Sequence, residues 1–347
     1  MRILRLPVQK VSPGGEPISE PEITQPVDLC LPNGRLNPQA VGWTRTALHR
    51  SNLRGWGRNK RFEYWSISVP EGIFSVNISH HDYRANVSVT FWNRTTNMEI
   101  RQGGNTWLPR HRRISDPQDR IPMQASRREV EVSLTPVGLG TVVEASSSRI
   151  RLSLRIEAEP GHESMGVVVP WTDKLFQYTK KDNCLRASGV ATVDGAEYRI
   201  APQTSSAVHD RGRGRWPYFT FWNWGAGSGR TEDGRDIGLQ VGGKWTDGTP
   251  STENWIRVNG RLHKISEHLD WQYHPADWLR PWTLTGPTTK IEFVPDTHLY
   301  HRFNRWIVLS RTDTCLGRYS GEVRLADGEV VNFSDIPGHV EEVERRW

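Results

Sequence analysis

The chain has 347 residues, more than one hydrophobic core usually contains, so we expect two domains or one large β structure. Only 35% of the residues are hydrophobic, but 16 tryptophans supply large apolar surfaces, which argues against a disordered chain. The net charge of +6 favours anionic partners in general, yet the Lys/Arg blocks typical of nucleic-acid-binding arms are missing from the sequence.

Cysteine content and hydropathy indicate the compartment. Cys30, Cys184 and Cys315 are far apart and odd in number, so they indicate neither a disulfide framework nor paired zinc ligands. The N-terminus lacks the apolar segment of a signal peptide, and no run of about eighteen apolar residues could span a bilayer. We therefore expect a cytoplasmic protein with reduced thiols.

The first half of the chain predicts short strands after an irregular start. Residues 1–25 are rich in proline and predict a flexible N-terminal arm. From Arg61 onward, apolar and polar residues alternate with the period of a strand that has one face in a core. Residues 98–128 break this alternation and predict a long loop. Strands resume after Val130.

The second half is marked by hairpin signals. Asp-Gly or Asn-Gly pairs stand between alternating apolar runs, and both residues of such a pair tolerate the positive φ of a tight hairpin turn. The pairs begin at Asp194, Asp233, Asp247, Asn259 and Asp327. Many short antiparallel strands joined in this way predict an all-β fold of two antiparallel β-barrel halves with little helix, residues 26–185 and 186–347.

The stretch 210–229 has an unusual composition, with an acid, alternating arginines and glycines, and three tryptophans. In a strand, the arginines would share one face and the glycines the other, where a ligand or another backbone can approach closely. The residues concerned are Arg211, Arg213 and Arg215, with Gly212 and Gly214 between them.

Two interpretations of this stretch remain open. In the functional one, Asp210 lies in a barrel mouth as an acid, and Arg213 binds an anion or keeps Asp210 ionised. In the structural one, Asp210 and Arg213 form an ion pair, while the tryptophans fill a core. The tryptophans are Trp216, Trp222 and Trp224.

Two further groups could take part in catalysis. His81 and Asp82 are a candidate acid–base pair, because histidine titrates near neutral pH, although a structural hydrogen bond is the alternative and a zinc site would need further ligands. Glu253 could pair with Asp210, as two carboxylates do in glycoside hydrolysis, or could simply cap a turn. The sequence has no P-loop or dinucleotide-binding motif, so we expect no cofactor.

Several segments together resemble the uncharacterised bacterial family called domain of unknown function 2804. The resemblance covers nearly the whole chain after the arm. It rests on Leu29 to Pro38, Gln177-Tyr178-Thr179, Asn183-Cys184-Leu185, Asp210-x-Gly-x-Gly-x-Trp-Pro-Tyr218, Trp222-x-Trp-Gly225, Thr252-Glu253-Asn254, Arg280-Pro281-Trp282, Gly317 to Gly321, and Gly338 through Glu341 to Trp347.

The family in turn resembles the lipocalin-like group of carotenoid hydratases and tocopherol cyclase, which implies two calycin-like halves. Arg211 and Arg215 stand where we expect a tryptophan and a small apolar residue, which implies a more cationic pocket. From the residue patterns and the resemblance together, we expect catalytic roles for Asp210, Glu253, His81 and Asp82. The expected substrate-binding residues are Arg213, Trp216, Tyr218, Trp222, Trp224, Asn254, Trp282, Arg318 and Tyr319.

The leading hypothesis is a cofactor-independent enzyme for acid-assisted hydration, cyclisation or isomerisation of an apolar or amphiphilic small molecule, with Asp210 as proton donor. The first alternative is a lipocalin-like binding protein without catalysis. The second is a glycan-active enzyme with paired carboxylates. Nucleic acid is not an expected partner, and the sequence leaves the oligomeric state open.

Overall fold

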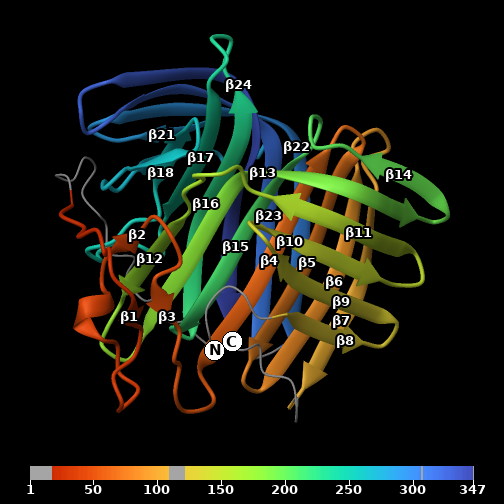
Figure 1. Ribbon diagram of the computed structural model, residues 1–347, viewed down its shortest axis with the longest axis horizontal. Coiled ribbons are helices and arrows are strands. Elements are labelled where there is room, and N and C mark those ends of the chain that lie inside the picture. Colours follow the sequence, from red (N-terminus) through yellow and green to blue (C-terminus); the bar gives the residue numbers. More distant parts are fainter. Residues whose placement is uncertain (1–17, 109–121, 306–307, 347) are drawn as a thin grey trace.

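The structure is a computed structural model that describes residues 18–108, 122–305 and 308–346. These residues form two large antiparallel sheets, and their only helix is the short 3-10 turn η1 (Pro38–Ala40). This confirms the all-β prediction (Figure 1). Within those ranges, no helix has the length and apolar character needed to cross a membrane. Cys30, Cys184 and Cys315 are free thiols.

The first sheet has thirteen strands and curls on itself, because β8 and β9 return to contact β6. In spatial order, its main path is β7 (Glu99–Trp107), β6 (Arg84–Asn93), β5 (Gly72–His81), β4 (Asn59–Val69), β15 (Ser206–Arg215), β13 (Phe176–Val193), β11 (Ile150–Glu157), β10 (Gly140–Ser146), β9 (Val130–Val137) and β8 (Met123–Arg127). Beside this path lie β12 (Met165–Pro170), β14 (Ala196–Ile200) and β2 (Trp43–Thr44). A separate two-stranded pair is formed by β1 (Val27–Asp28) and β3 (His49–Arg50).

The second sheet has nine strands in one continuous path. In spatial order, they are β19 (Arg261–Lys264), β18 (Trp255–Val258), β17 (Asp236–Gly243), β16 (Phe219–Arg230), β24 (Val330–Arg346), β23 (Val308–Arg324), β22 (Thr289–Arg305), β21 (Trp282–Thr285) and β20 (Asp270–Gln272). Its three longest strands are consecutive hairpin partners, which makes this half a simple up-and-down meander at the C-terminal end.

Each sheet buries one face in its own core, as the alternation in sequence requires. On β4, Trp65 and Ile67 point into the first core, whereas Tyr64 and Ser66 point to the other face. On β24, Val340 lies in the second core. The residues on either side of Val340, His339 and Glu341, point away from that core, toward the first sheet. The outer faces of the two sheets therefore meet, and the side chains there are largely polar.

Some of the Asp-Gly and Asn-Gly pairs form the predicted tight hairpin turns, and others do not. Asp194-Gly195 and Asn259-Gly260 are two-residue turns in which both residues have positive φ, as predicted. Asp247-Gly248 instead lies in the longer loop between β17 and β18.

Three boundaries differ from the prediction. Position 186 falls inside β13, and the chain leaves the first sheet only after Arg215, because β15 inserts between β4 and β13. The predicted loop 98–128 contains β7 and β8, whose polar side chains hide the strand period; residues 109–121 lie outside the described parts. In the predicted arm, residues 1–17 are likewise outside the description, but the side chain of Glu20 is buried against the second sheet.

Candidate functional site

A cavity of about 800 Å³ lies where the outer faces of the two sheets meet. The first sheet contributes outward side chains of β4 to β7, β13 and β15, and the second contributes those of β16 and β22 to β24. Clefts between domains are common binding places for small molecules, and this volume suits one. The cavity is thus not the barrel mouth that the sequence suggested.

The stretch around Asp210 separates two environments. Asp210 faces the cavity, and Gly212 and Gly214 lie on the same side of β15. A Cβ on Gly212 would collide with the ring of Phe62 and the amide of Gln177, both of which line the cavity. Glycine is required here because these neighbours occupy the space of a side chain.

Arg211 and Arg213 point the opposite way, into the first barrel, while Arg215 donates to the carbonyl of Arg54. Glu63 accepts from Arg213 at 2.5 Å and from His209 at 2.7 Å, and it forms an ion pair with Arg211 at 3.3 Å. Burial acts to raise the pKa of Glu63, but Arg213, Arg211 and His209 outweigh it and hold that pKa well below its usual value. The predicted contact between Arg213 and Asp210 is therefore wrong, because successive strand residues alternate between faces.

Lys181 is the partner that Asp210 has instead. Its ammonium lies 2.7 Å from Asp210 and 3.4 Å from Glu253, so the two predicted carboxylates do meet, on one cation. Thr179 also donates to Asp210 at 3.2 Å. Burial acts to lower the pKa of Lys181, but Asp210, Glu253 and Glu341 outweigh it and raise the pKa. Sequence reasoning missed Lys181, although it lies two residues after Thr179 on the same strand face.

Glu253 is enclosed by donors. Trp245 Nε1 donates to its Oε1 at 2.5 Å, and Gln240 donates to Oε2 at 3.4 Å. Its side chain is 1% exposed. Burial raises the pKa of Glu253, and Lys181 and Trp245 oppose that rise only in part. This carboxylate is positioned to hold Lys181 and Trp245 in place.

Glu341 is a third cavity carboxylate, which sequence reasoning did not single out. Trp222 Nε1 donates to its Oε1 at 2.9 Å, and among the described contacts Oε2 accepts no hydrogen bond. Burial raises the pKa of Glu341, against the opposing effects of Trp222, Arg345 and Lys181. The only signal in the sequence was its place in the C-terminal motif quoted above.

Aromatic rings cover the wall between these acids. Lys181 lies over the ring of Trp224 at 4.4 Å, and Trp224 Nε1 donates to Gln240 at 3.0 Å. Trp216 and Trp222 meet edge to face at 5.7 Å. His339 packs edge-on against Trp224, and burial together with the charge of Lys181 lowers its pKa to about 4. The three predicted tryptophans therefore line one cavity.

The remaining predicted residues separate into two groups. His81 lines the cavity, whereas Asp82 turns away to bind Arg61 at 3.1 Å and the backbone of residues 57 and 59. The others serve the fold or the surface. Tyr218 is 37% exposed, and Arg318 forms an ion pair with exposed Asp335. Asn254 forms hydrogen bonds with backbone groups of Gly242 and Glu267. Trp282 stacks on Tyr273 in the second core, and buried Tyr319 donates to the carbonyl of His339.

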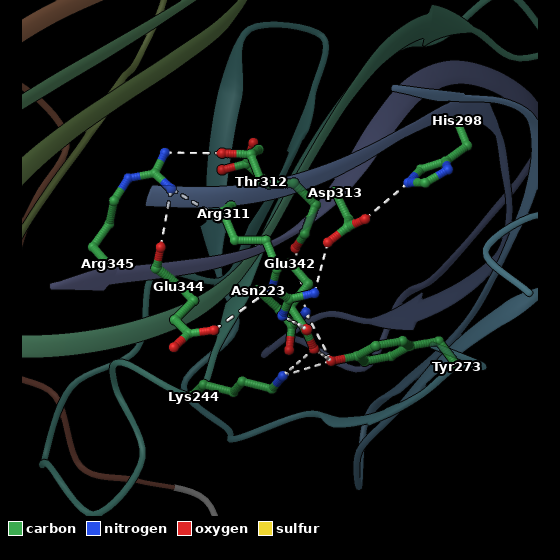
Figure 2. A network of polar contacts seen from close by, with 11 residues as sticks. Asn223, Lys244, Tyr273, His298, Arg311, Thr312, Asp313, Glu342, Glu344 and Arg345 are labelled. Atoms are coloured by element: carbon green, nitrogen blue, oxygen red, sulfur yellow. Dashed lines mark hydrogen bonds and ion pairs between the residues drawn. The ribbon is translucent and has the colours of Figure 1, made fainter. Parts of the chain in front are cut away.

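A further polar network, centred on Glu342, lies mostly on the inner side of the second sheet (Figure 2). Glu342 accepts from Lys244 at 2.5 Å and also from Tyr273 and Arg311. Arg311 donates to Asp313 at 2.7 Å, and His298 lies 3.0 Å from the same carboxylate. Glu342 and Glu341 are neighbours in sequence but face opposite sides of β24, so the contacts of Glu342 lie on the side away from the cavity. Thr312 and Arg345, which are also drawn, line the cavity, and Arg345 donates to the carbonyl of Arg311. Within the described ranges, no three His, Cys, Asp or Glu side chains are grouped as metal ligands.

Among the solved structures similar to this chain are two from different organisms. One is a putative AttH from Nitrosomonas europaea, 11% identical, with a TM-score of 0.48 over 82% of this chain and 92% of that chain. The other is kievitone hydratase from Nectria haematococca, 13% identical, with a TM-score of 0.43 over 84% of this chain and 89% of that chain. No curated protein matches.

The family comparison covers almost all of the described chain. The family model that matches spans residues 20–347, which confirms the resemblance inferred from the motifs. The chain therefore belongs to the family described as Domain of unknown function (DUF2804).

Proposed function

We propose that the cavity between the sheets binds an apolar or amphiphilic small molecule and performs acid-assisted chemistry on it: hydration, cyclisation or isomerisation of an alkene. The observation that supports this most is the meeting of Asp210 and Glu253 on one buried ammonium, with Glu341 and three tryptophans lining the same cavity. Titratable groups with shifted pKa values in an aromatic cavity are typical of acid–base catalysis.

The proposed roles differ from those expected from the sequence. Glu341 is the proton donor, since burial raises its pKa and its Oε2 accepts no hydrogen bond among the described contacts. Asp210 is the acceptor, because both of its oxygens already receive hydrogen bonds from Thr179 and Lys181. Trp222 and Trp224 would place their π faces toward a developing carbocation.

For hydration, the atoms balance as follows. Glu341 transfers its proton to one alkene carbon, and the π electron pair forms the new C–H bond. A water molecule adds to the cationic carbon and gives its second proton to Asp210. Exchange with solvent then returns a proton to Glu341 and removes one from Asp210, so the net change is addition of one water.

The test uses heavy water, because all three reaction types place a solvent-derived proton on carbon. The protein is incubated with a panel of apolar and amphiphilic alkenes, and deuterium on carbon is measured by mass spectrometry. We expect incorporation with wild type and a loss of about a hundredfold or more in Glu341→Gln and in Asp210→Asn. Glu322→Gln, which alters an exposed ion pair with Lys290, is the matched control.

Two results would contradict the proposal. One is full incorporation in both variants, which would show that Glu341 and Asp210 are not the acid and the base. The other is alkene binding, seen as a change in tryptophan fluorescence, without any deuterium uptake in wild type, which identifies a binding protein instead. Glycoside hydrolysis is not proposed, because Asp210 and Glu253 share Lys181 rather than facing each other across an open groove.

A further inference from the structure

The end of the cavity away from Asp210 is lined by a row of basic side chains on the first sheet. In the register of the sheet, His81 on β5 is opposite Arg84 on β6. Arg61 on β4 is opposite His80, which places Lys60 beside His81. Lys60, His81 and Arg84 therefore form a row across β4, β5 and β6, and all three line the cavity. At about 4.8 Å between neighbouring strands, the row is roughly 10 Å wide.

The second sheet adds a cation to the same end. Arg345 lies four residues after Glu341 on β24, and it lines the cavity with its guanidinium 5.2 Å over the ring of Trp222. On the first sheet, Lys60 is opposite Gly214 of β15, and Gly214 is likewise four residues along its strand from Asp210. At about 3.3 Å per residue, four residues separate the Cα atoms by roughly 13 Å along each strand.

The hydrogen-bond partners described for these two arginines are neutral. Arg84 donates to the amide oxygen of Asn105 at 2.8 Å, and Arg345 donates to Thr312 at 2.9 Å and to backbone carbonyls. Cations gathered in a partly buried site repel one another, and their desolvation is offset when an anion binds. The pKa of Lys60 follows this pattern: burial lowers it, and the charges of Arg58, Arg84 and Arg345 lower it further.

Aromatic rings bridge the two ends. Trp222 donates to Glu341 and packs under Arg345, and Lys60 lies over Trp216 at 5.5 Å. A ligand with a charged head among the cations would thus lay an apolar body along Trp216 and Trp222. Its far end would reach Glu341 and Asp210.

We propose that the ligand of this cavity is an amphiphilic organic anion, an apolar chain with a carboxylate or phosphate head held by Lys60, Arg84 and Arg345. This inference rests on the proposed function for the place of binding, but it adds the class of molecule and the residues that select it. Guanidinium groups bind both kinds of head through paired hydrogen bonds.

The test compares three probes of equal chain length: decanoate, decyl phosphate and decanol. Affinities for the full chain are measured by quenching of tryptophan fluorescence and by calorimetry. We expect wild type to bind at least one of the two anions about tenfold or more tightly than decanol, since hydrogen bonds to charged groups have this magnitude. The stronger of the two anions identifies the head group.

Variants then test which residues cause the preference for the anionic probe. Lys60→Met and Arg84→Gln should each reduce affinity for the preferred anion about tenfold while leaving decanol affinity unchanged, and the decanol measurement also shows that the cavity has folded. Arg318→Gln removes one positive charge from an exposed pair with Asp335 and should change neither affinity.

Three outcomes would overturn the proposal: equal affinity of wild type for all three probes, no measurable binding of any probe, or an anion preference that survives in both variants. The proposed function is judged separately. Decanol binding without anion preference rejects only the anion site, and the deuterium assay on Glu341→Gln reports on catalysis whatever the head group.

Discussion

At the scale of single residues, Glu63 is the counter-charge for the basic side chains buried in the first barrel. Its side chain is 3% exposed and forms ion pairs with His209, Arg211 and Arg213. Two arginines of one strand therefore share a single counter-charge. Removing one partner of a buried ion pair leaves the other charged and unpaired, which is costly. This cluster explains Arg211 and Arg213 without any role for them in the cavity.

We expect Glu63→Gln to lower the free energy of unfolding by about 3 kcal/mol or more, because Arg211 and Arg213 would keep their charge without a counter-charge. Urea denaturation followed by circular dichroism measures the loss. The control is Glu322→Gln, which changes an exposed pair and should stay within about 0.5 kcal/mol of wild type. A Glu63 variant as stable as wild type would show that the cluster does not stabilise the fold.

The same variant gives a pH dependence. The pKa of Glu63 in the fold lies well below its unfolded value of 4.5, so its stabilising contribution is complete above about pH 4.5 and is lost as the pH falls further. The difference in unfolding free energy between wild type and Glu63→Gln should therefore narrow on acidification below pH 4.5. A difference that stays constant from pH 6 to pH 3 would contradict this assignment.

Strand β15 illustrates how one element serves two environments. Its glycine face approaches Phe62 and Gln177 at the cavity, and its arginine face enters the first barrel. Because the strand is central in its sheet, with β4 on one side and β13 on the other, neither face can move to relieve a clash. The composition of this stretch follows from that placement.

Gly212→Ala tests this constraint. The added methyl group would overlap the ring of Phe62, and overpacking of this kind costs about 1–3 kcal/mol. Gly104→Ala is the matched control, since a Cβ there would meet only Arg127 Cγ at 3.5 Å. Thermal unfolding of the two proteins should show a clear loss for Gly212→Ala and little change for Gly104→Ala. Equal melting temperatures would refute the close-packing explanation.

At the scale of the whole molecule, residues 18–23 connect the two sheets. Ile18 donates to the carbonyl of Ser266, and Glu20 accepts from Thr252 and from Lys264 at 2.6 Å, all on the side of the second sheet. Ile23 donates to the carbonyl of Trp43 on β2, which belongs to the first sheet. This short segment therefore bridges both halves.

Glu20→Ala should lower the free energy of unfolding by about 3 kcal/mol, because Lys264, which is 5% exposed, would lose its counter-charge. Glu22→Ala alters a half-exposed pair with Arg45 and should cost no more than about 1 kcal/mol. Denaturant titration of both variants measures the contrast. Equal losses of unfolding free energy in the two variants would mean that the buried pair of Glu20 with Lys264 does not stabilise the contact of this segment with the second sheet.

Local patterns in the sequence accounted for much of the architecture. Alternation identified β4 to β6, and residue pairs such as Asn259-Gly260 identified tight turns, because strand period and turn φ angles depend on neighbouring residues only. Strand β7 escaped prediction because its cavity face is polar. The boundary near residue 186 failed because β15 returns to the first sheet, a long-range pairing without a local signal.

The sequence by itself determined the β class, and it separated the face of Asp210 and the glycines from the face of the arginines, since a strand alternates whatever surrounds it. Only the tertiary structure decided that the Asp210 face meets Lys181, Glu253 and Glu341. These residues lie on β13, before β18 and on β24, and they are neighbours because strand register and the packing of two outer faces bring them together.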